Sequence, residues 1–413
     1  MKKIITAICM IIAVVYASSS GILYAQNDTV PVIVDRVING TITVDPAPPA
    51  DGRYAAGTVL TIKAAPDKGY VLDSGYYSVK GMYGQMYHEF MAPEFKVTVD
   101  QEKHIGASFI EKSEVSHVNV IRDVVYAKPG VKTLKYDVYI PKGAKKLPII
   151  IIIHGGGWAA NNEDIMRGMA RELTRDKKYV VCSIDYRWAG EKDGDATSNT
   201  MADIIGDVFG AIAHIMEHAA EYRGDATRIA LTGDSAGGHL CAAAADMADK
   251  IGRGGFGKTP GVFEFMPSYI PKNTSVKEVR TEIMSAVKAV APSYGVFEGD
   301  FLKTYSDDPR ADETWKDAIS PIKNIPDAKV RAVPHYLIRG SNDPLIKDEA
   351  VKAYMDALVT AGQRVEYVQV GGASHAFFDW KPDEATKATF KKYGVYHCRQ
   401  MELFFDSVFF GVK

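Results

Sequence analysis

The chain has 413 residues, of which 46% are hydrophobic and 24% charged, a balance that excludes an intrinsically disordered protein. Lys and Arg number 49 and Asp and Glu 51, so the formal net charge of -2 does not favour nucleic-acid binding. The four cysteines form no Cys-x-x-Cys pair, which argues against a disulfide-stapled scaffold and a cysteine-based zinc site.

The first 25 residues predict a secretory signal peptide. Lys2 and Lys3 precede an apolar stretch at residues 4–16, and Ala25 offers a small residue for cleavage. The stretch is shorter than the roughly 20 apolar residues of a membrane span, although an uncleaved anchor is the alternative. We expect an exported protein, periplasmic or extracellular, without a membrane span in the mature chain. Buried free thiols are expected at Cys182, Cys241 and Cys398.

Residues 27–112 have the pattern of a small β-rich domain. Short alternating runs such as Thr41–Val44 and Val59–Ile62 predict strands separated by turn residues. Asn39-Gly40 predicts a hairpin, and the Pro-Ala-Pro-Pro run at residues 46–49 predicts a loop.

One segment of this region resembles a known repeat. Residues 57–66, followed by Gly69-Tyr70, are similar to the β-repeat of bacterial surface proteins called the Listeria–Bacteroides or internalin-type B repeat. Aromatic side chains of the domain either stack on sugar rings or form its core, and the large area that aromatics bury favours the core. These side chains are Tyr76, Tyr77, Tyr83 and Tyr87.

From residue 115 to the C-terminus the pattern becomes that of an α/β domain. Residues 115–126 and 131–140 alternate around Lys128-Pro129-Gly130 and predict an antiparallel hairpin. Because unbroken apolar runs then alternate with helical stretches, we expect a mostly parallel sheet covered by helices on both faces. The runs are residues 147–153, 179–184, 228–231, 287–290, 334–338 and 365–370. In such sheets, chemistry gathers past the carboxyl ends of the strands.

Glycine-rich motifs with reactive side chains follow four of these runs. They are His154–Trp158 (His-Gly-Gly-Gly-Trp), Gly233–Gly238 (Gly-Asp-Ser-Ala-Gly-Gly), Gly340–Asp343 (Gly-Ser-Asn-Asp) and Gly371–His375 (Gly-Gly-Ala-Ser-His). A serine, an acid and a histidine therefore occur in that chain order, each after a predicted strand. A Gly-x-Ser-x-Gly turn between strand and helix is typical of a nucleophile elbow.

These residue types suit acyl transfer. The hydroxyl of Ser235 is a weak nucleophile until a base takes its proton, and His375 titrates near neutrality. Asp343 would fix the tautomer of that imidazole. The amide of Ala236 and amides of the glycines at 155–157 can donate to a developing oxyanion.

Together with Asp185-Tyr186-Arg187, these motifs resemble the α/β-hydrolase fold and, within it, esterases of the hormone-sensitive-lipase-like group. The resemblance covers residues 123–410 and implies an α/β-hydrolase fold with a mostly parallel central sheet, here preceded by a small all-β domain at 27–112. It implies no cofactor and no metal ion. It makes Ser235 the nucleophile, Asp343 the acid and His375 the base, with oxyanion-hole amides from Gly156, Gly157 and Ala236.

With the export signal and the β-domain, the chain looks most like secreted bacterial feruloyl and acetyl-xylan esterases. We therefore expect a serine carboxylesterase acting on acetyl or feruloyl esters of plant polysaccharide. An oligopeptidase-type serine peptidase, a lipase and a non-catalytic glycan-binding protein on a hydrolase scaffold are the alternatives. Aromatic residues that either bind an acyl group or form ordinary loop cores are Trp158, Phe297, Phe301, Tyr305 and Trp315.

Two further motifs lack the context that they need. Residues 252–259 match a phosphate-binding loop, but a helical stretch precedes them and Pro260 follows, which predicts a plain loop. His214 and His218 match the H-x-x-E-H zinc signature, yet they border the apolar stripe of a helix and are expected on its surface. Structural roles are expected for Asp234, His239, His335, Asp348 and His397.

Overall fold

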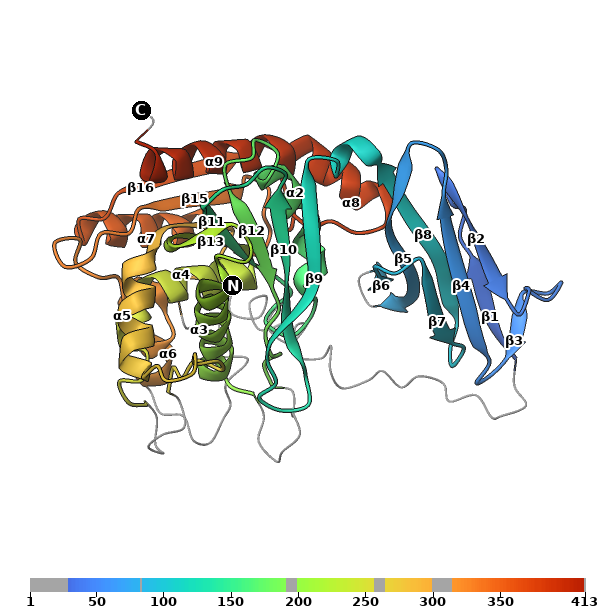
Figure 1. The fold of residues 1–413 in the computed structure, drawn as a ribbon, viewed down its shortest axis with the longest axis horizontal. Coiled ribbons are helices and arrows are strands. Elements are labelled where there is room, and N and C mark those ends of the chain that lie inside the picture. The colour runs from blue at the N-terminus through green and yellow to red at the C-terminus, as the bar shows by residue number, and fades with distance from the viewer. Residues whose placement is uncertain (1–28, 82–83, 191–198, 256–263, 299–313, 412–413) are drawn as a thin grey trace, which may run out of the picture. The chain divides into compact units, whose positions relative to one another are not determined.

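The structure is a computed structural model that describes residues 29–81, 84–190, 199–255, 264–298 and 314–411 (Figure 1). The chain divides into two compact units. The N-terminal unit comprises residues up to Ser116 with Lys381–Lys387, and the C-terminal unit comprises His117–Trp380 and Ala388–Lys413. The predicted signal peptide at residues 1–25 lies outside the described residues. Within the described ranges, no helix combines the length and apolar character that crossing a bilayer requires.

The N-terminal unit is built from short alternating strands. They are β1 (Thr29–Val34), β2 (Gly40–Asp45), β3 (Arg53–Ala55), β4 (Val59–Pro66), β5 (Tyr70–Gly81), β6 (Gly84–Phe90), β7 (Glu94–Thr98) and β8 (Lys103–Glu111). The described strands form two sheets, ordered β3-β1-β8-β5-β6 and β2-β4-β7. Alternation buries every second side chain, so in β4 Leu60 and Ile62 are buried whereas Val59 is exposed.

The hairpin predicted at Asn39-Gly40 is wrong. Asn39 does adopt a left-handed conformation with φ 66°, but β1 pairs with β3 and β8 whereas β2 pairs with β4. The turn therefore carries the chain from one sheet to the other. A left-handed Asn before Gly marks a turn in either case, and local sequence does not specify which strands then pair.

Core packing accounts for the described tyrosines of this unit. Tyr76 is 9% exposed and its hydroxyl donates to Asp35 at 2.9 Å. Tyr77 packs against the main core, and the half-buried ring of Tyr87 meets Tyr76 edge-on with centroids 5.3 Å apart. Tyr83 lies outside the described residues. The described rings therefore favour the core interpretation over an open sugar-stacking surface.

The C-terminal unit is organised around one mixed sheet (Figure 1). Its strands are β9 (Val118–Ala127), β10 (Leu134–Pro141), β11 (Leu147–Ile153), β12 (Val180–Ile184), β13 (Gly224–Asp234), β14 (Val287–Ser293), β15 (His335–Gly340) and β16 (Val365–Val370). In the described part of the unit their order is β16-β15-β14-β13-β11-β12-β10-β9. Neighbours from β16 to β12 are parallel, and β10 is antiparallel to both β12 and β9. The predicted parallel sheet and terminal hairpin are confirmed.

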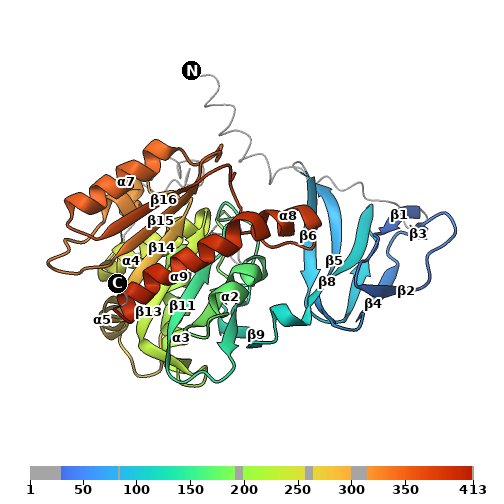
Figure 2. The same cartoon turned by 90° about the horizontal axis from the view of Figure 1, so that it is seen from above.

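Helices cover both faces of this sheet (Figure 2). They are α2 (Arg167–Leu173), α3 (Met201–His218), α4 (Ala236–Asp246), α5 (Val276–Ala286), α6 (Thr314–Ala318), α7 (Asp348–Thr360) and α9 (Val395–Phe409). A further helix, α8 (Glu384–Thr389), begins within the segment Lys381–Lys387 of the N-terminal unit. Helices α2 and α9 pack together on one face, and α3, α4 and α5 pack together on the other. The strand between them has to be apolar on both sides, and Ile149–Ile153 of β11 are fully buried.

The histidines of the H-x-x-E-H match have structural partners, and the expected surface position is wrong for His214. This residue is 8% exposed, and its Nδ1 lies 2.9 Å from the hydroxyl of Tyr136 in β10. Burial lowers the pKa of His214 to about 4, so the ring is neutral at neutral pH. His218 is partly exposed and pairs with Glu221 at 2.8 Å. Sequence periodicity missed the burial because Tyr136 lies 78 residues away along the chain.

The cysteines of the described chain carry free, buried thiols, as predicted. Cys182 lies in β12, Cys241 in α4 and Cys398 in α9. Burial raises the pKa of each thiol, which disfavours the reactive thiolate.

The predicted plain loop after α4 is described only at residues 252–255, which form no helix; residues 256–259 lie outside the described ranges.

Candidate active site

Ser235 occupies a sharp turn between a strand and a helix. Because β13 ends at Asp234 and α4 begins at Ala236, Ser235 alone makes the connection, with φ 51° and ψ -115°. Such a conformation is strained for a residue with a side chain. The Ser235 N–H donates to the carbonyl of Ser293 at the end of β14 (2.9 Å), which holds the turn. The hydroxyl therefore stands at the carboxyl end of the sheet.

Glycines on both sides of Ser235 allow the backbone to close this turn. A Cβ on Gly237 would lie 1.9 Å from the carbonyl oxygen of Ile153, and a Cβ on Gly233 would lie 2.4 Å from that of Gly237. These neighbours are backbone atoms of packed elements and cannot rotate away as a flexible side chain would. The Gly-x-Ser-x-Gly pattern is thus a packing requirement of the turn.

Replacing Gly237 with alanine is expected to lower the free energy of unfolding by about 3 kcal/mol or more, because the new methyl group overlaps β11. Urea unfolding of the purified variant measures the change. Gly371→Ala is the matched control, since a Cβ there meets no atom within 4 Å. Equal stability of the two variants would contradict the steric argument.

The structure brings the predicted serine, histidine and aspartate together. His375, five residues beyond β16, places Nε2 2.8 Å from Oγ of Ser235. Its Nδ1 lies 2.8 Å from Oδ2 of Asp343, which follows β15. Residues separated by 140 and 32 positions thus form one chain of hydrogen bonds. A hydroxyl, an imidazole and a carboxylate in this order can pass a proton from the hydroxyl to the imidazole.

The carboxylate of Asp343 is fixed from two directions. Its Oδ1 accepts the N–H groups of Leu345 (2.8 Å) and Ile346 (2.9 Å), while Oδ2 faces His375. Burial alone would raise the pKa of Asp343, but these hydrogen bonds and the interaction with His375 outweigh it and lower the pKa. Asp343 therefore stays ionised next to the imidazole.

The competing residues Asp348 and His335 have other partners, and His397 is buried in a helix. Asp348 begins α7 and pairs with Lys352 at 2.7 Å. Nδ1 of His335 lies 2.7 Å from the carbonyl of Val333, and His397 is 8% exposed within α9. Each of the three has a position that fits the structural role expected from the sequence.

The loop after β11 lies next to the turn at Ser235. The N–H of Gly155 donates to Oδ1 of Asp234 at 2.6 Å. Gly156 and Gly157 follow with φ 124° and 59°, conformations that glycine adopts without strain. Within the described residues, the N–H groups of Gly156 and Gly157 have no hydrogen-bond partner. We call residues 154–158 the oxyanion loop, because such free amides can stabilise a developing negative charge.

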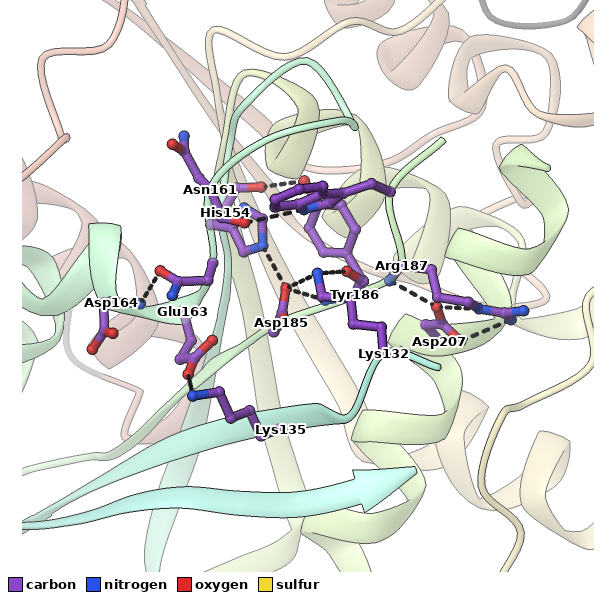
Figure 3. Close-up of polar contacts among 12 residues, drawn as sticks. Lys132, Lys135, His154, Asn161, Glu163, Asp164, Asp185, Tyr186, Arg187 and Asp207 are labelled. Carbon is purple, nitrogen blue, oxygen red and sulfur yellow. Dashed lines mark hydrogen bonds and ion pairs between the residues drawn. The ribbon is translucent and has the colours of Figure 1, made fainter. Parts of the chain in front are cut away.

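A network of side chains supports this loop (Figure 3). Asp185, just after β12, places Oδ1 3.3 Å from Nε2 of His154. Tyr186 stacks on the His154 ring with centroids 4.2 Å apart, and its hydroxyl donates to the His154 carbonyl at 2.8 Å. Arg187 pairs with Asp207 of α3 at 2.9 Å. The Asp185-Tyr186-Arg187 run therefore anchors the oxyanion loop to the sheet and to α3.

The structure does not favour the predicted substrate-binding role of Trp158. Its side chain is 2% exposed, and its indole Nε1–H donates to Nδ1 of His239 in α4 at 3.1 Å. The ring thus lies inside the protein, where it packs against His239 of α4. Its place beside the oxyanion glycines suggested a contact with the acyl group, and no local pattern indicates the partner His239, 81 residues away.

The described aromatic residues of the insertions are loop cores. Phe297 is 4% exposed and stacks on Tyr354 with centroids 4.1 Å apart, and Trp315 in α6 is 7% exposed. Phe301 and Tyr305 lie outside the described residues.

Tyr294, which the sequence did not single out, contacts His375 directly. It follows β14, and its ring centroid lies 4.8 Å from that of His375. Its hydroxyl accepts the N–H of Phe378 at 3.2 Å, which fixes the ring beside the imidazole. No sequence signal beyond its position after a predicted strand could have found it.

An acidic group elsewhere in the unit offers possible ligands for a cation. Asp123, Asp137 and Glu163 each place a carboxylate oxygen within 4.8 Å of the others. The ammonium of Lys135 lies 3.0 Å from Glu163 and also bonds Asp123, and Arg122 pairs with Asp137 at 2.6 Å. The positive charges of Lys135 and Arg122 thus already balance these carboxylates, and we assign no metal to them.

The family model BD-FAE matches residues 136–358, more than half of the chain. The chain belongs to the BD-FAE family. The BD-FAE match includes Gly156, Ser235 and Asp343 and ends before His375, which the fold adds to the same site. The resemblance to hormone-sensitive-lipase-like esterases is confirmed. A second family model, the divergent InlB B-repeat domain, matches residues 30–113 and confirms the resemblance of the β-rich segment.

Individual proteins similar to this BD-FAE chain include named esterases. Carboxylesterase NlhH of Mycobacterium tuberculosis is 28% identical over 250 residues, which cover 57% of this chain and 69% of the relative. Carboxylic ester hydrolase LipN of the same species is 28% identical over 259 residues, covering 58% and 60%. Both names agree with the predicted enzyme class, a carboxylic ester hydrolase.

Among solved structures, the propionate-bound esterase Est2 of Thermogutta terrifontis covers 70% of this chain and 95% of its own, with TM-score 0.50 and 22% identity. This likeness concerns the fold, which is the α/β-hydrolase fold.

Proposed function

We propose that this BD-FAE protein is a serine carboxylesterase with Ser235 as its nucleophile. The observation that carries the proposal is the unbroken chain of hydrogen bonds from Ser235 through His375 to Asp343. Three further observations support the proposal independently of these hydrogen bonds. They are the strained turn at Ser235, the glycine loop after β11 and the named relatives.

In the proposed mechanism, Oγ of Ser235 attacks the ester carbonyl carbon while Nε2 of His375 takes the hydroxyl proton. The resulting imidazolium faces the charged carboxylate of Asp343, which stabilises it. The tetrahedral intermediate then collapses, and its alcohol leaves with the proton from His375. Water attacks the acyl-enzyme by the same route and releases the acid. The negative oxygen of each intermediate accepts hydrogen bonds from the amides of Gly156, Gly157 and Ala236.

As natural substrates we propose acetyl or feruloyl esters of plant polysaccharide, reached by export to the periplasm or beyond. The signal-like residues 1–25 support export. The B-repeat match at residues 30–113 supports a place among surface or secreted proteins, as the resemblance implied.

Purified protein is expected to hydrolyse para-nitrophenyl acetate and to react covalently with a labelled fluorophosphonate, because the probe reports an activated serine. Initial rates on acetyl, butyryl, feruloyl and long-chain esters and on a proline amide rank the ester, lipase and peptidase alternatives. We expect short acyl or feruloyl esters to be preferred. Probe labelling with hydrolysis of the amide alone would establish the peptidase, and failure on every short ester would overturn the proposal.

A further inference from the structure

Two side chains that flank the nucleophile hold the oxyanion loop. Asp234 immediately precedes Ser235, and its Oδ1 accepts the N–H of Gly155 at 2.6 Å. His239 lies one helical turn after Ser235, and its Nδ1 accepts the indole N–H of Trp158 at 3.1 Å. The two held residues bracket residues 156–157, whose amides are the proposed oxyanion donors.

The bonding partners of His239 define its tautomer. An indole nitrogen can only donate, so Nδ1 of His239 must carry the lone pair. A carbonyl oxygen can only accept, so Nε2 must carry the hydrogen that faces the carbonyl of Ile319 at 2.9 Å. Both ring nitrogens are therefore engaged, one with the oxyanion loop and one with the segment after α6.

Burial keeps the ring in this state. His239 is fully buried, and desolvation lowers its pKa to about 4, although the hydrogen bond to Ile319 opposes the change. The imidazole is thus neutral at neutral pH, and Nδ1 remains an acceptor. The His239 ring does not contact the reacting atoms. The backbone N–H of His239 donates to the backbone carbonyl of Ser235 at 3.1 Å, as in a regular helix.

The conformation of Trp158 explains why such a contact is needed. Trp158 adopts φ 62°, which is strained for a bulky side chain. A strained residue persists when its surroundings hold it. The hydrogen bond to His239 and the edge-on packing of the two rings, with centroids 5.6 Å apart, provide that hold.

We propose that His239 is a positioning residue that, together with Asp234, sets the direction of the Gly156 and Gly157 amides. The inference rests on the proposed function, since it assigns a role in stabilising the oxyanion of that reaction. The motif Gly-Asp-Ser-Ala-Gly-Gly-His then supplies the nucleophile and both supports of the charge-stabilising loop within residues 233–239. The stabilisation by these amides acts on the transition state, because the substrate oxygen that they contact becomes fully negative only as that state is passed.

The test compares three variants with the wild-type protein. His239→Leu removes the acceptor for Trp158, and His239→Asn restores an acceptor oxygen at the position of Nδ1. His335→Leu is the matched control: His335 is equally buried and hydrogen-bonded, but its partners are Val333, Tyr354 and Asp246. The kcat and KM for para-nitrophenyl acetate are measured below the melting temperature of every variant. The inhibition constant of a trifluoromethyl ketone, which forms a tetrahedral oxyanion adduct, is measured alongside.

For His239→Leu we expect kcat to fall about 10- to 100-fold and ketone affinity to fall by a similar factor, with KM nearly unchanged. His239→Asn should recover most of both losses, and His335→Leu should change neither. An active wild type with unchanged kcat and ketone affinity in His239→Leu would overturn the positioning role. If His239→Leu does not fold, Trp158→Phe removes the donor from the other side, and the same outcomes apply. Loss of ester hydrolysis in the wild type would instead reject the proposed function.

Discussion

Replacing Ser235 with alanine is expected to reduce kcat for short acyl esters by about 10⁶-fold, to the level of background hydrolysis. The variant lacks the atom that His375 contacts at 2.8 Å, and the other groups cannot form an acyl-enzyme without it. Initial rates with para-nitrophenyl acetate, and loss of labelling by a fluorophosphonate, measure the effect.

Ser374→Ala is the matched control for this experiment. Ser374 is an exposed serine next to His375, so its loss should leave both kcat and labelling unchanged. Circular dichroism and the melting temperature establish that both variants are folded. Substantial turnover by folded Ser235→Ala protein would show that another group is the nucleophile.

Replacing Asp343 with asparagine is expected to reduce kcat about 10⁴-fold at neutral pH, through the wrong tautomer of His375. The N–H groups of Leu345 and Ile346 would keep the amide oxygen in the place of Oδ1. The amide nitrogen then faces Nδ1 of His375 and donates to it. The imidazole must carry its hydrogen on Nε2, where it can no longer accept the proton of Ser235.

A control for this second experiment is Asp348→Asn, which alters the nearby acid that pairs with Lys352 at the start of α7. It should retain wild-type kcat. Because Asp343→Asn keeps the hydroxyl and the oxyanion loop, it should keep a KM close to that of the wild type. A kcat within tenfold of the wild type in folded Asp343→Asn protein would remove Asp343 from the proposed mechanism.

Strands with apolar runs could be predicted from the sequence, but only some of their ends could. Residues 147–153 and 365–370 match β11 and β16 at both ends. The run at 228–231 gave only the middle of β13, which extends from Gly224 to Asp234. Polar residues such as Thr232 continue the ladder because β14 pairs alongside, and that pairing leaves no trace in the local pattern.

The candidate site was predictable where it depends on strand ends. Ser235, Asp343 and His375 each follow a recognisable strand, and the parallel sheet brings those ends to one edge. Contacts between loops and helices were not predictable. Trp158 was assigned to substrate because it lies beside the oxyanion glycines, and nothing local indicates its partner His239, 81 residues away. Tyr294 has no motif of its own.

The free thiols have a practical consequence for handling the protein. The described residues contain no disulfide, and Cys182, Cys241 and Cys398 are enclosed by apolar packing in the C-terminal unit. Disulfide bonds between these cysteines therefore contribute nothing to the stability of this unit. Production in a reducing cytosol, without oxidoreductase helpers, should give correctly folded material, and dithiothreitol in the buffer should be harmless.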